Sequence, residues 1–568
     1  MISINILSSV PENLVILFEI GIMIIIAAVF AFLIKILKQP LIPAYIISGI
    51  FLGPLLLGII ENQELILSLS EIGVAFLIFT AGLEINFKKL KEVGKASTLG
   101  GILQIGIMFA IAFFISLLLG FSGKSLIYIG LVVAFSSTMV VVKLLYDRRE
   151  LGSLHGRIII GILLIQDFAA IIALTILTTD FSLYSIAIAL GKASIFVILS
   201  LILSKAINPL LKKSAKSQEL LLLTAIAFLF LFSISAIIAD LSLIIGAFFA
   251  GLALANSDYK TEIQGEVSSI RNFFAVIFFV ALGMQLKIIS SEFLILLLVL
   301  IALVLIIKPL IIMFLIRILG YKKRTAFLTG NALAQTSEFS LIIVTLGFNL
   351  GHINQGLFST LILLTIITMS LTTYLIRYER KFSVWFSFPL SIFNKLGSIE
   401  SKLEYLKKDG KNTIIFGCHR MGSLLLKDLI EKKEKVIVVD YDPDIIKSLI
   451  NKKIPCIYGD FVNHEVLDKL ELQNSKRIIS TIPDVDDNLL LIKKVKSLNK
   501  KVPMFVSANR ISEALKLYEK GADYVILPQV ISGQKSFELI KRLSRNYNLK
   551  KLKKEHIKYL NSIHRILY

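Results

Sequence analysis

A single carboxylate, Asp167, lies in the middle of an apolar segment, residues 156–180, that is long enough to cross a membrane. Because a charge at bilayer depth is costly, such residues usually mark ion pathways or proton relays. A base, Lys308, lies at a comparable depth in another apolar segment. An acid and a base placed in this way predict the transport of small cations and protons.

Further polar residues in the middle of apolar segments are related by an internal repeat. Three pairs of segments match at similar offsets, starting at Leu41 and Leu243 (243 − 41 = 202), around Gly82 and Gly283 (283 − 82 = 201), and at Gly130 and Gly330 (330 − 130 = 200). The third pair aligns two polar clusters, Ser136-Ser137-Thr138 and Thr336-Ser337-Glu338. Such groups can satisfy the backbone where membrane helices break, or can coordinate a cation.

The elements that carry these residues belong to a polytopic membrane protein. The chain has 568 residues, of which 56% are hydrophobic, and a mean hydropathy of +0.80. A window of about 20 residues predicts about thirteen spans, centred near Met23, Ile50, Phe76, Met108, Ser136, Asp167, Ile195, Phe228, Phe249, Phe279, Leu305, Ser337 and Thr365. The repeat offset equals seven spans, so the second copy runs in the opposite sense, which is typical of secondary transporters.

Charge and composition predict the topology and the domains. The loops after odd-numbered spans are mostly rich in Lys and Arg, which places the N-terminus outside and the C-terminal domain in the cytoplasm. We expect a membrane exchange domain at 1–382, a linker at 383–410, a nucleotide-binding domain at 411–545 and a basic tail at 546–568. The net charge of +21 lies largely in loops and tail, so nucleic acid is not an expected partner. The two cysteines lack metal-site spacing, and no tightly bound metal is expected.

The polar residues of the membrane domain predict an exchange site. We expect an alkali cation to bind at Asp167, Ser137 and Thr138, because one carboxylate can hold a proton or a desolvated cation but not both well. Alternating access to that acid is then sufficient for exchange. Structural alternatives are a buried polar role for Asp167, an ion pair of Lys308 with Asp167 or Glu338, and helix packing by small residues, Ser136 included. Glu338 could hold broken helix ends or contact the cation.

The C-terminal domain has the pattern of a doubly wound nucleotide-binding fold. TIIF predicts a strand, GCHRMG opens a helix, and VIVVD predicts the next strand. Gly417 and Gly422 flank the turn, and Asp440 lies where a ribose-binding acid is expected (440 − 417 = 23). Asp460 ends a further strand. We therefore expect a Rossmann-like domain.

The turn departs from the dinucleotide fingerprint at one position. His419 stands where the middle glycine should let the backbone approach a pyrophosphate. AMP, NAD(H) and ATP all remain candidate ligands, and His419 and Arg420 could contact phosphate. The alternative is that the domain binds no ligand and only dimerises.

The chain resembles the cation:proton antiporter-2 family, and within it the Kef-like potassium efflux members. The matching motifs are FLIFTAGLEIN, AFSSTMVV, GILLIQDFAAI, FFVALGM and ALAQTSEFSLII. The pair Gln166-Asp167 is the most specific. The resemblance implies that Asp167 carries the ion and proton, that Lys308, followed by Pro309, partners the carrier acid, and that the cation is K⁺ or Na⁺.

The C-terminal domain is similar to the regulator-of-potassium-conductance (TrkA-N, or KTN) domain. That similarity implies gating by a nucleotide in the cytoplasm, and the family implies a homodimer in the plasma membrane. The combined prediction is a polytopic α-helical domain with inverted repeats and crossed broken helices, followed by an α/β Rossmann-like domain. Its function would be monovalent cation:proton antiport, which is transport and not enzyme catalysis.

Two other functional classes are alternatives to antiport. A nucleotide-gated cation channel would use the same soluble domain, but no TVGYG-type filter occurs in the sequence. A membrane-tethered nucleotide-dependent oxidoreductase would need a catalytic domain, and none is evident after the nucleotide-binding pattern.

Overall fold

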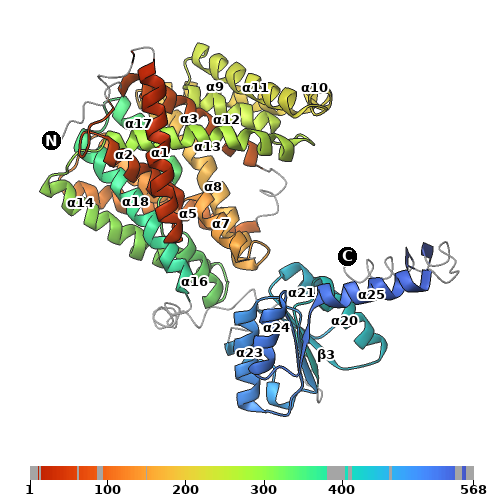
Figure 1. Cartoon of the computed structure of the whole chain (residues 1–568). Coiled ribbons are helices and arrows are strands. Elements are labelled where there is room, and N and C mark those ends of the chain that lie inside the picture. The colour runs from red at the N-terminus through yellow and green to blue at the C-terminus, as the bar shows by residue number, and fades with distance from the viewer. Residues whose placement is uncertain are drawn as a thin grey trace. The chain divides into compact units, whose positions relative to one another are not determined.

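The structure is a computed structural model that describes residues 11, 14–60, 63–85, 94–148, 150–379, 403–406, 412–459, 464–543, 553–554 and 556–557 (Figure 1). The chain forms two compact units, one of residues 1–151, 155–319 and 323–395, the other of residues 152–154, 320–322 and 396–568. The predicted borders at 382, 410 and 545 stay predictions. Most of the predicted linker and tail lies outside the described residues.

The first unit is helical. Its elements are α1 (Val15–Ile36), α2 (Leu41–Leu52), α3 (Gln63–Glu84), α5 (Gly94–Leu118), α6 (Ser125–Ala134), α7 (Thr138–Asp147), α8 (Leu154–Leu177), α9 (Leu183–Ala206), α10 (Asn208–Ser214), α11 (Gln218–Ile238), α12 (Leu243–Leu254), α13 (Lys260–Met284), α14 (Ser291–Ala302), the π-turn η3 (Leu303–Ile307), α15 (Lys308–Ile318), α16 (Lys323–Ala332), α17 (Glu338–Asn349) and α18 (Gln355–Arg377).

These helices are those of a membrane protein. Among the described residues, nine helices are long and apolar enough to cross a membrane, by length and composition, and shorter apolar helices accompany them at Leu41–Leu52, Leu243–Leu254 and Glu338–Asn349. All predicted span centres fall, in order, in a helix or in one of the two breaks, between α6 and α7 and between α16 and α17. The count of thirteen spans stays a prediction.

The predicted inverted repeat is visible in the helix pairs. Helices α2 and α12 each have 12 residues and start 202 residues apart (243 − 41 = 202). In space the partners are exchanged, because α2 packs against α13 and α3 packs against α12 (Figure 1). This exchange is what a two-fold axis between two copies produces.

Glycines make both of these contacts close. A Cβ at Gly283 would lie 2.9 Å from Cα of Gly49, and a Cβ at Gly251 would lie 3.0 Å from Cα of Gly82. The repeat relates Gly49 to Gly251 (251 − 49 = 202) and Gly82 to Gly283, so the same contact is built twice. Small residues let membrane helices approach in this way.

A π-turn positions the predicted base. Proline at 309 has no N–H to donate, and its ring collides with the carbonyl four residues earlier. The wide turn η3, directly before α15, accommodates this defect and places Lys308 at the first position of α15. Lys308 is fully buried.

The second unit is a doubly wound α/β domain. Its strands are β1 (Glu404–Tyr405), β2 (Thr413–Phe416), β3 (Val436–Asp440), β4 (Cys456–Tyr458), β5 (Arg477–Ser480), β6 (Met504–Ser507) and β7 (Tyr524–Ile526), and its helices are α20 (Arg420–Glu431), α21 (Pro443–Asn451), α22 (His464–Lys469), the 3₁₀ turn η5 (Leu472–Asn474), α23 (Val485–Leu498), α24 (Ile511–Glu519) and α25 (Pro528–Leu543).

The sheet has the order β1-β4-β3-β2-β5-β6-β7, and β1 alone pairs antiparallel. Both faces of β2 are buried: Ile414 and Phe416 contribute to one core, and Ile415 to the other. In register, Thr413 pairs with Val436 of β3 on one side and with Arg477 of β5 on the other. Strand order reverses between β2 and β5, which is where such folds bind ligands.

Candidate functional site

Two helices of the membrane unit break in their middle, at residues 135–137 and 333–337, which we call the crossing. Each following half-helix starts with a serine cap. Ser137 Oγ accepts from the N–H of Val140 at 3.2 Å, and Ser337 Oγ accepts from the N–H of Phe339 at 3.1 Å. Serine is favoured at this position because it satisfies an orphan donor of the first turn. The two caps lie 200 residues apart (337 − 137 = 200).

Hydrogen bonds join the two breaks to each other. Ser136 Oγ donates to the carbonyl oxygen of Leu333 at 3.0 Å, and Ser137 Oγ donates to Glu338 Oε1 at 2.5 Å. Gln335 Nε2 donates to the carbonyl oxygen of Ser137 at 3.4 Å. The structure therefore brings together Ser136, Ser137 and Glu338, as the repeat predicted.

Lys308 donates hydrogen bonds to carbonyl groups at the ends of the broken helices. Its Nζ donates to the main-chain oxygens of Val133 at 3.0 Å, Phe135 at 2.8 Å and Gln335 at 2.7 Å. These bonds use all three ammonium hydrogens and neutralise the partial negative charge of both helix ends. In the described part of the chain, Lys308 makes no ion pair with Asp167 or Glu338.

Asp167 lies on α8 beside the start of α7. Thr138 Oγ1 lies 3.1 Å from Asp167 Oδ1 and 3.0 Å from Oδ2, so one hydroxyl hydrogen is shared by both carboxylate oxygens. Thr138 and Asp167 are partly exposed, whereas Ser136 and Ser137 are buried. The carboxylate is thus held by Thr138 at the edge of the crossing.

Gln166, the neighbour of Asp167, is a positioning residue. Its Oε1 accepts from the N–H of Ser136 at 2.8 Å, and its Nε2 donates to Gln104 Oε1 at 2.5 Å. Gln104, on α5, donates in turn to the carbonyl oxygen of Ala134 at 2.8 Å. The two amides together satisfy the backbone on both sides of the first break.

The second copy has a hydroxyl where the first copy has the carboxylate of Asp167. The position equivalent to Asp167 is Thr368 on α18 (368 − 167 = 201). Its Oγ1 lies 3.2 Å from Thr336 Oγ1, and Thr372 donates to the carbonyl oxygen of Ala334. Threonines of α18 therefore satisfy the second break without a charge, and the two copies of the repeat differ at this position.

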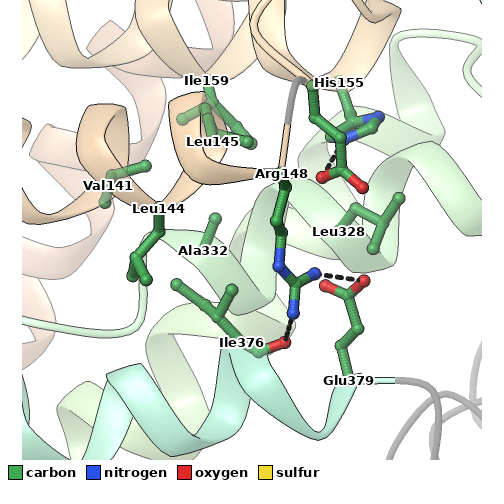
Figure 2. Close-up of a pocket in the computed structure, with 11 residues that line it drawn as sticks. Val141, Leu144, Leu145, Arg148, His155, Ile159, Leu328, Ala332, Ile376 and Glu379 are labelled. Atoms are coloured by element: carbon green, nitrogen blue, oxygen red, sulfur yellow. Dashed lines mark hydrogen bonds and ion pairs between the residues drawn. The ribbon is translucent and has the colours of Figure 1, made fainter. Parts of the chain in front are cut away.

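A small pocket lies at the other end of α7 (Figure 2). Arg148 points toward Glu379, with an Nη1–Oε1 distance of 2.6 Å, and donates to the carbonyl oxygen of Ile376 at 2.5 Å (Figure 2). His155 Nε2 lies 3.2 Å from Glu150 Oε2. The cavity has a volume of ≈ 10 Å³, room for about one water molecule. Arg148 thus fastens the last turn of α7 to the last turn of α18.

In the soluble unit, the predicted glycine turn is a close contact. Gly417 has a φ of +85°, and a Cβ at Gly422 would lie 1.9 Å from the carbonyl oxygen of Gly417. Thr481, just after β5, donates to the same oxygen at 2.9 Å. Only glycine fits both positions, as the fingerprint predicted.

Asp440 braces this turn. Its Oδ2 accepts from the N–H of Cys418 at 2.6 Å and its Oδ1 from the N–H of Asp442 at 2.8 Å. Burial raises the pKa of Asp440, although these two N–H groups act in the opposite direction. Asp440 ends β3 as predicted; ribose binding by it stays a prediction.

The remaining predicted nucleotide contacts are only partly described. His419 is exposed at the N-terminus of α20. Arg420 begins that helix, but its side chain lies outside the described residues, and so does Asp460.

The profile of the transmembrane sodium/hydrogen exchangers matches residues 22–377, which is more than half of the chain. The chain belongs to the sodium/hydrogen exchanger family. A second profile, that of the TrkA-N domain, matches residues 413–528. The predicted class, cation:proton antiporter with a TrkA-N domain, is confirmed, and the family is one of transporters, not enzymes.

Two relatives of this chain are named as cation/proton or K⁺ efflux antiporters. The chain is 26% identical over 523 residues to the putative cation/proton antiporter YbaL of Escherichia coli (strain K12), with 89% of this chain and 93% of that protein aligned. It is 32% identical over 374 residues to K(+) efflux antiporter 5 of Arabidopsis thaliana, with 63% and 65% aligned.

The helical fold is also similar to a solved structure. The sodium proton antiporter MjNhaP1 from Methanocaldococcus jannaschii matches with a TM-score of 0.52 and 17% identity, over 68% of this chain and 99% of that chain. At this identity the likeness shows the fold alone. The predicted fold class, a helical antiporter domain followed by a Rossmann-like domain, is confirmed.

Two buried amides of this exchanger were missed by sequence reasoning. Gln104 is an isolated amide in an apolar segment, which is a signal of the same kind as that of Asp167. Gln335 directly precedes the second polar cluster. Gln104 supports the backbone next to the first break, and Gln335 lies within the second break.

Proposed function

We propose that this exchanger moves a monovalent cation, K⁺ or Na⁺, against a proton at Asp167. The observation that carries the proposal is the partly exposed Asp167 carboxylate held by Thr138 at the edge of the crossing. A carboxylate in this place can be neutralised by a proton or by an alkali cation, and either one discharges the site before it moves through the bilayer.

The surrounding residues support one carrier acid. Lys308 neutralises the carbonyl ends of the broken helices, and Glu338 is bonded to Ser137 at the start of α7. The amide of Gln166 is hydrogen-bonded to the N–H of Ser136 and to the side chain of Gln104. Of the Asp167 and Glu338 carboxyl groups, Asp167 is therefore the one available for exchange, with the cation bound at Asp167, Thr138 and Ser137. One carrier charge predicts exchange of one cation for one proton.

Alternating access follows from the inverted repeat. The α2–α13 and α3–α12 contacts are two copies of one interface, so that the two orientations of the crossing relative to them are nearly equivalent.

We propose the topology given by the basic loops, with the N-terminus outside, the TrkA-N domain in the cytoplasm, and a homodimer in the plasma membrane.

Proteoliposomes test the transport reaction. The full chain is reconstituted with a pH-sensitive dye inside, and K⁺, Na⁺ or choline is added outside. Antiport predicts alkalinisation or acidification that depends on the direction of the K⁺ or Na⁺ gradient and is not seen with choline. Cation flux that leaves the internal pH unchanged would favour a channel.

We also propose that the TrkA-N domain binds a nucleotide where strand order reverses, between β2 and β5. Gly417 and Gly422 would place the start of α20 against phosphate, with His419 and Arg420 beside it, and with Asp440 and Asp460 toward the ribose. His419 carries a side chain where a pyrophosphate would approach, which favours AMP, with its single phosphate, over NAD(H) or ATP, which contain a pyrophosphate.

Nucleotide-induced thermal stabilisation of the full chain tests this ligand assignment. AMP should raise the melting temperature more than NAD(H) does, and His419→Gly should increase the effect of NAD(H). If His419→Gly still prefers AMP over NAD(H) to the same extent, the side chain of His419 is not what disfavours the pyrophosphate. The same nucleotides added to the proteoliposomes report gating.

A further inference from the structure

We propose that the side-chain amide oxygen of Gln335 is a ligand of the exchanged cation. This inference rests on the proposed function. Gln335 lies in the second break and is fully buried, yet its Oε1 has no hydrogen-bond partner among the described residues. A buried acceptor without a donor is costly, so a native protein that keeps one usually has a use for it.

The rest of Gln335 is fixed. Its main-chain oxygen accepts from Lys308 at 2.7 Å, and its Nε2 donates to the carbonyl oxygen of Ser137 at 3.4 Å. The orientation of the amide follows from these contacts, because the reversed amide would set two oxygens against each other at Ser137. The group that remains for a ligand is Oε1.

The other buried glutamines of the membrane unit show what an occupied amide looks like. Gln166 Oε1 accepts from the N–H of Ser136, and Gln104 Oε1 accepts from Gln166 Nε2. The oxygen of each of these two amides therefore accepts from a protein donor. Of the three, Gln335 alone keeps an acceptor that the described residues leave open.

A cation at Asp167 needs neutral oxygens as well as the carboxylate. Main-chain carbonyls of broken helices could supply them, but Lys308 already occupies those of Val133, Phe135 and Gln335. Side-chain oxygens must therefore supply more of the ligands of the cation. Amide oxygens are suitable ligands for hard cations. Gln335 contacts Ser137, which directly precedes Thr138, and Thr138 is the residue that donates to Asp167.

A neutral ligand has a specific consequence for the reaction. It adds no charge, so the exchange of one cation for one proton at Asp167 is unaffected. It stabilises the cation-bound state and contributes nothing to the protonated state. Gln335 should therefore set the affinity for the cation, and the choice between K⁺ and Na⁺, without changing the pH dependence of exchange at saturating cation.

The test uses Gln335→Met in the full chain, because methionine has a similar length and shape but no oxygen ligand. We expect the apparent KM for the cation to rise on the order of tenfold, as for loss of one supporting group at a metal site, with the maximal rate and its pH profile retained. The stabilisation of the purified chain against heat by K⁺ or Na⁺, relative to choline, should fall in parallel. Gln104→Met is the matched control, and its loss of two protein hydrogen bonds should lower the melting temperature in choline without a selective rise in KM.

If Oε1 merely holds a structural water, Gln335→Met will keep the KM of the wild-type chain and the same cation-induced stabilisation, and the inference is wrong. If Gln335→Met does not fold, Gln335→Asn withdraws the same oxygen by one methylene, and an unchanged KM in that variant overturns the inference equally. Absence of exchange in the wild-type chain would instead contradict the proposed function, so the two failures are distinct.

Discussion

Ser137 donates a hydrogen bond to Glu338 across the two breaks, with a distance of 2.5 Å between Oγ and Oε1. The two residues lie 201 residues apart (338 − 137 = 201), close to the offsets of the repeat. Ser137 caps α7 and Glu338 begins α17, so the bond joins the positive ends of two half-helices and places a carboxyl group between them. Glu338 therefore holds the crossing together.

Glu338→Gln should retain cation:proton exchange, since an amide oxygen can still accept from Ser137. We expect a lower melting temperature, by the equivalent of about 1 kcal/mol for the weaker neutral hydrogen bond, and a maximal rate within a fewfold of wild type. Dye-monitored exchange and thermal unfolding of the same preparation measure both. Complete loss of exchange in a stable Glu338→Gln chain would make Glu338 a second carrier.

Lys308→Met should destabilise the crossing. The substitution removes the donor shared by the carbonyl groups of Val133, Phe135 and Gln335. Each carbonyl left without a donor costs about 1–3 kcal/mol, offset in part because a buried charge is also removed.

Lys308→Gln offers a neutral donor that can serve part of this set, and we expect its melting temperature to lie between those of wild type and Lys308→Met. Exchange should follow stability across the series. Exchange lost in Lys308→Gln at wild-type stability would show that the positive charge takes part in transport directly.

Gly283→Ala tests the close contact of α13 with α2. The new Cβ would lie 2.1 Å from the main-chain oxygen of Ile46, so the helices must separate, at a cost of about 1–3 kcal/mol. Gly265→Ala is the control in the same helix, because its Cβ would have no neighbour within 4 Å. Thermal unfolding in detergent should show a loss for Gly283→Ala only; equal behaviour of the two variants would argue against this packing.

The two thiols of the soluble unit should resist alkylation. Burial raises the pKa of Cys418 to about 12, with the negative charge of Asp440 adding to the effect, and burial raises that of Cys456 to about 11. Unfolded thiols titrate near 9.0. Because the folded-state pKa is raised, the contribution of the neutral thiols to stability is complete below pH 9 and is lost as the pH rises toward 11–12.

Iodoacetamide labelling of the full chain measures this. At pH 8 the folded chain should react slowly and the denatured chain at both cysteines, and folded-state labelling should increase only above about pH 10. Rapid labelling of the native chain at pH 8 would show that Cys418 is neither buried nor neutral.

The positions of the two breaks could be predicted from the sequence, because hydroxyl and carboxyl groups in apolar segments have few other uses and the repeat supplies each cluster with a partner. The spacing of Gly417 and Asp440 likewise predicted a strand, turn and helix. Contacts with the main chain could not be predicted. The three carbonyl partners of Lys308 are not encoded by residue type, and Ser137, not Lys308, is the partner of Glu338. The open oxygen of Gln335 depends on where its amide nitrogen finds an acceptor, which only the folded crossing determines.

The most direct test of a single carrier acid is exchange by Asp167→Asn. Asparagine keeps an oxygen that can accept from the hydroxyl of Thr138. It can neither bind the proton nor neutralise the charge of the cation. In everted membrane vesicles with a pH-sensitive dye, K⁺- or Na⁺-dependent proton movement should fall to the level of vesicles without the protein, while the chain remains folded. Cation-dependent proton exchange retained by folded Asp167→Asn would contradict a single carrier acid at Asp167.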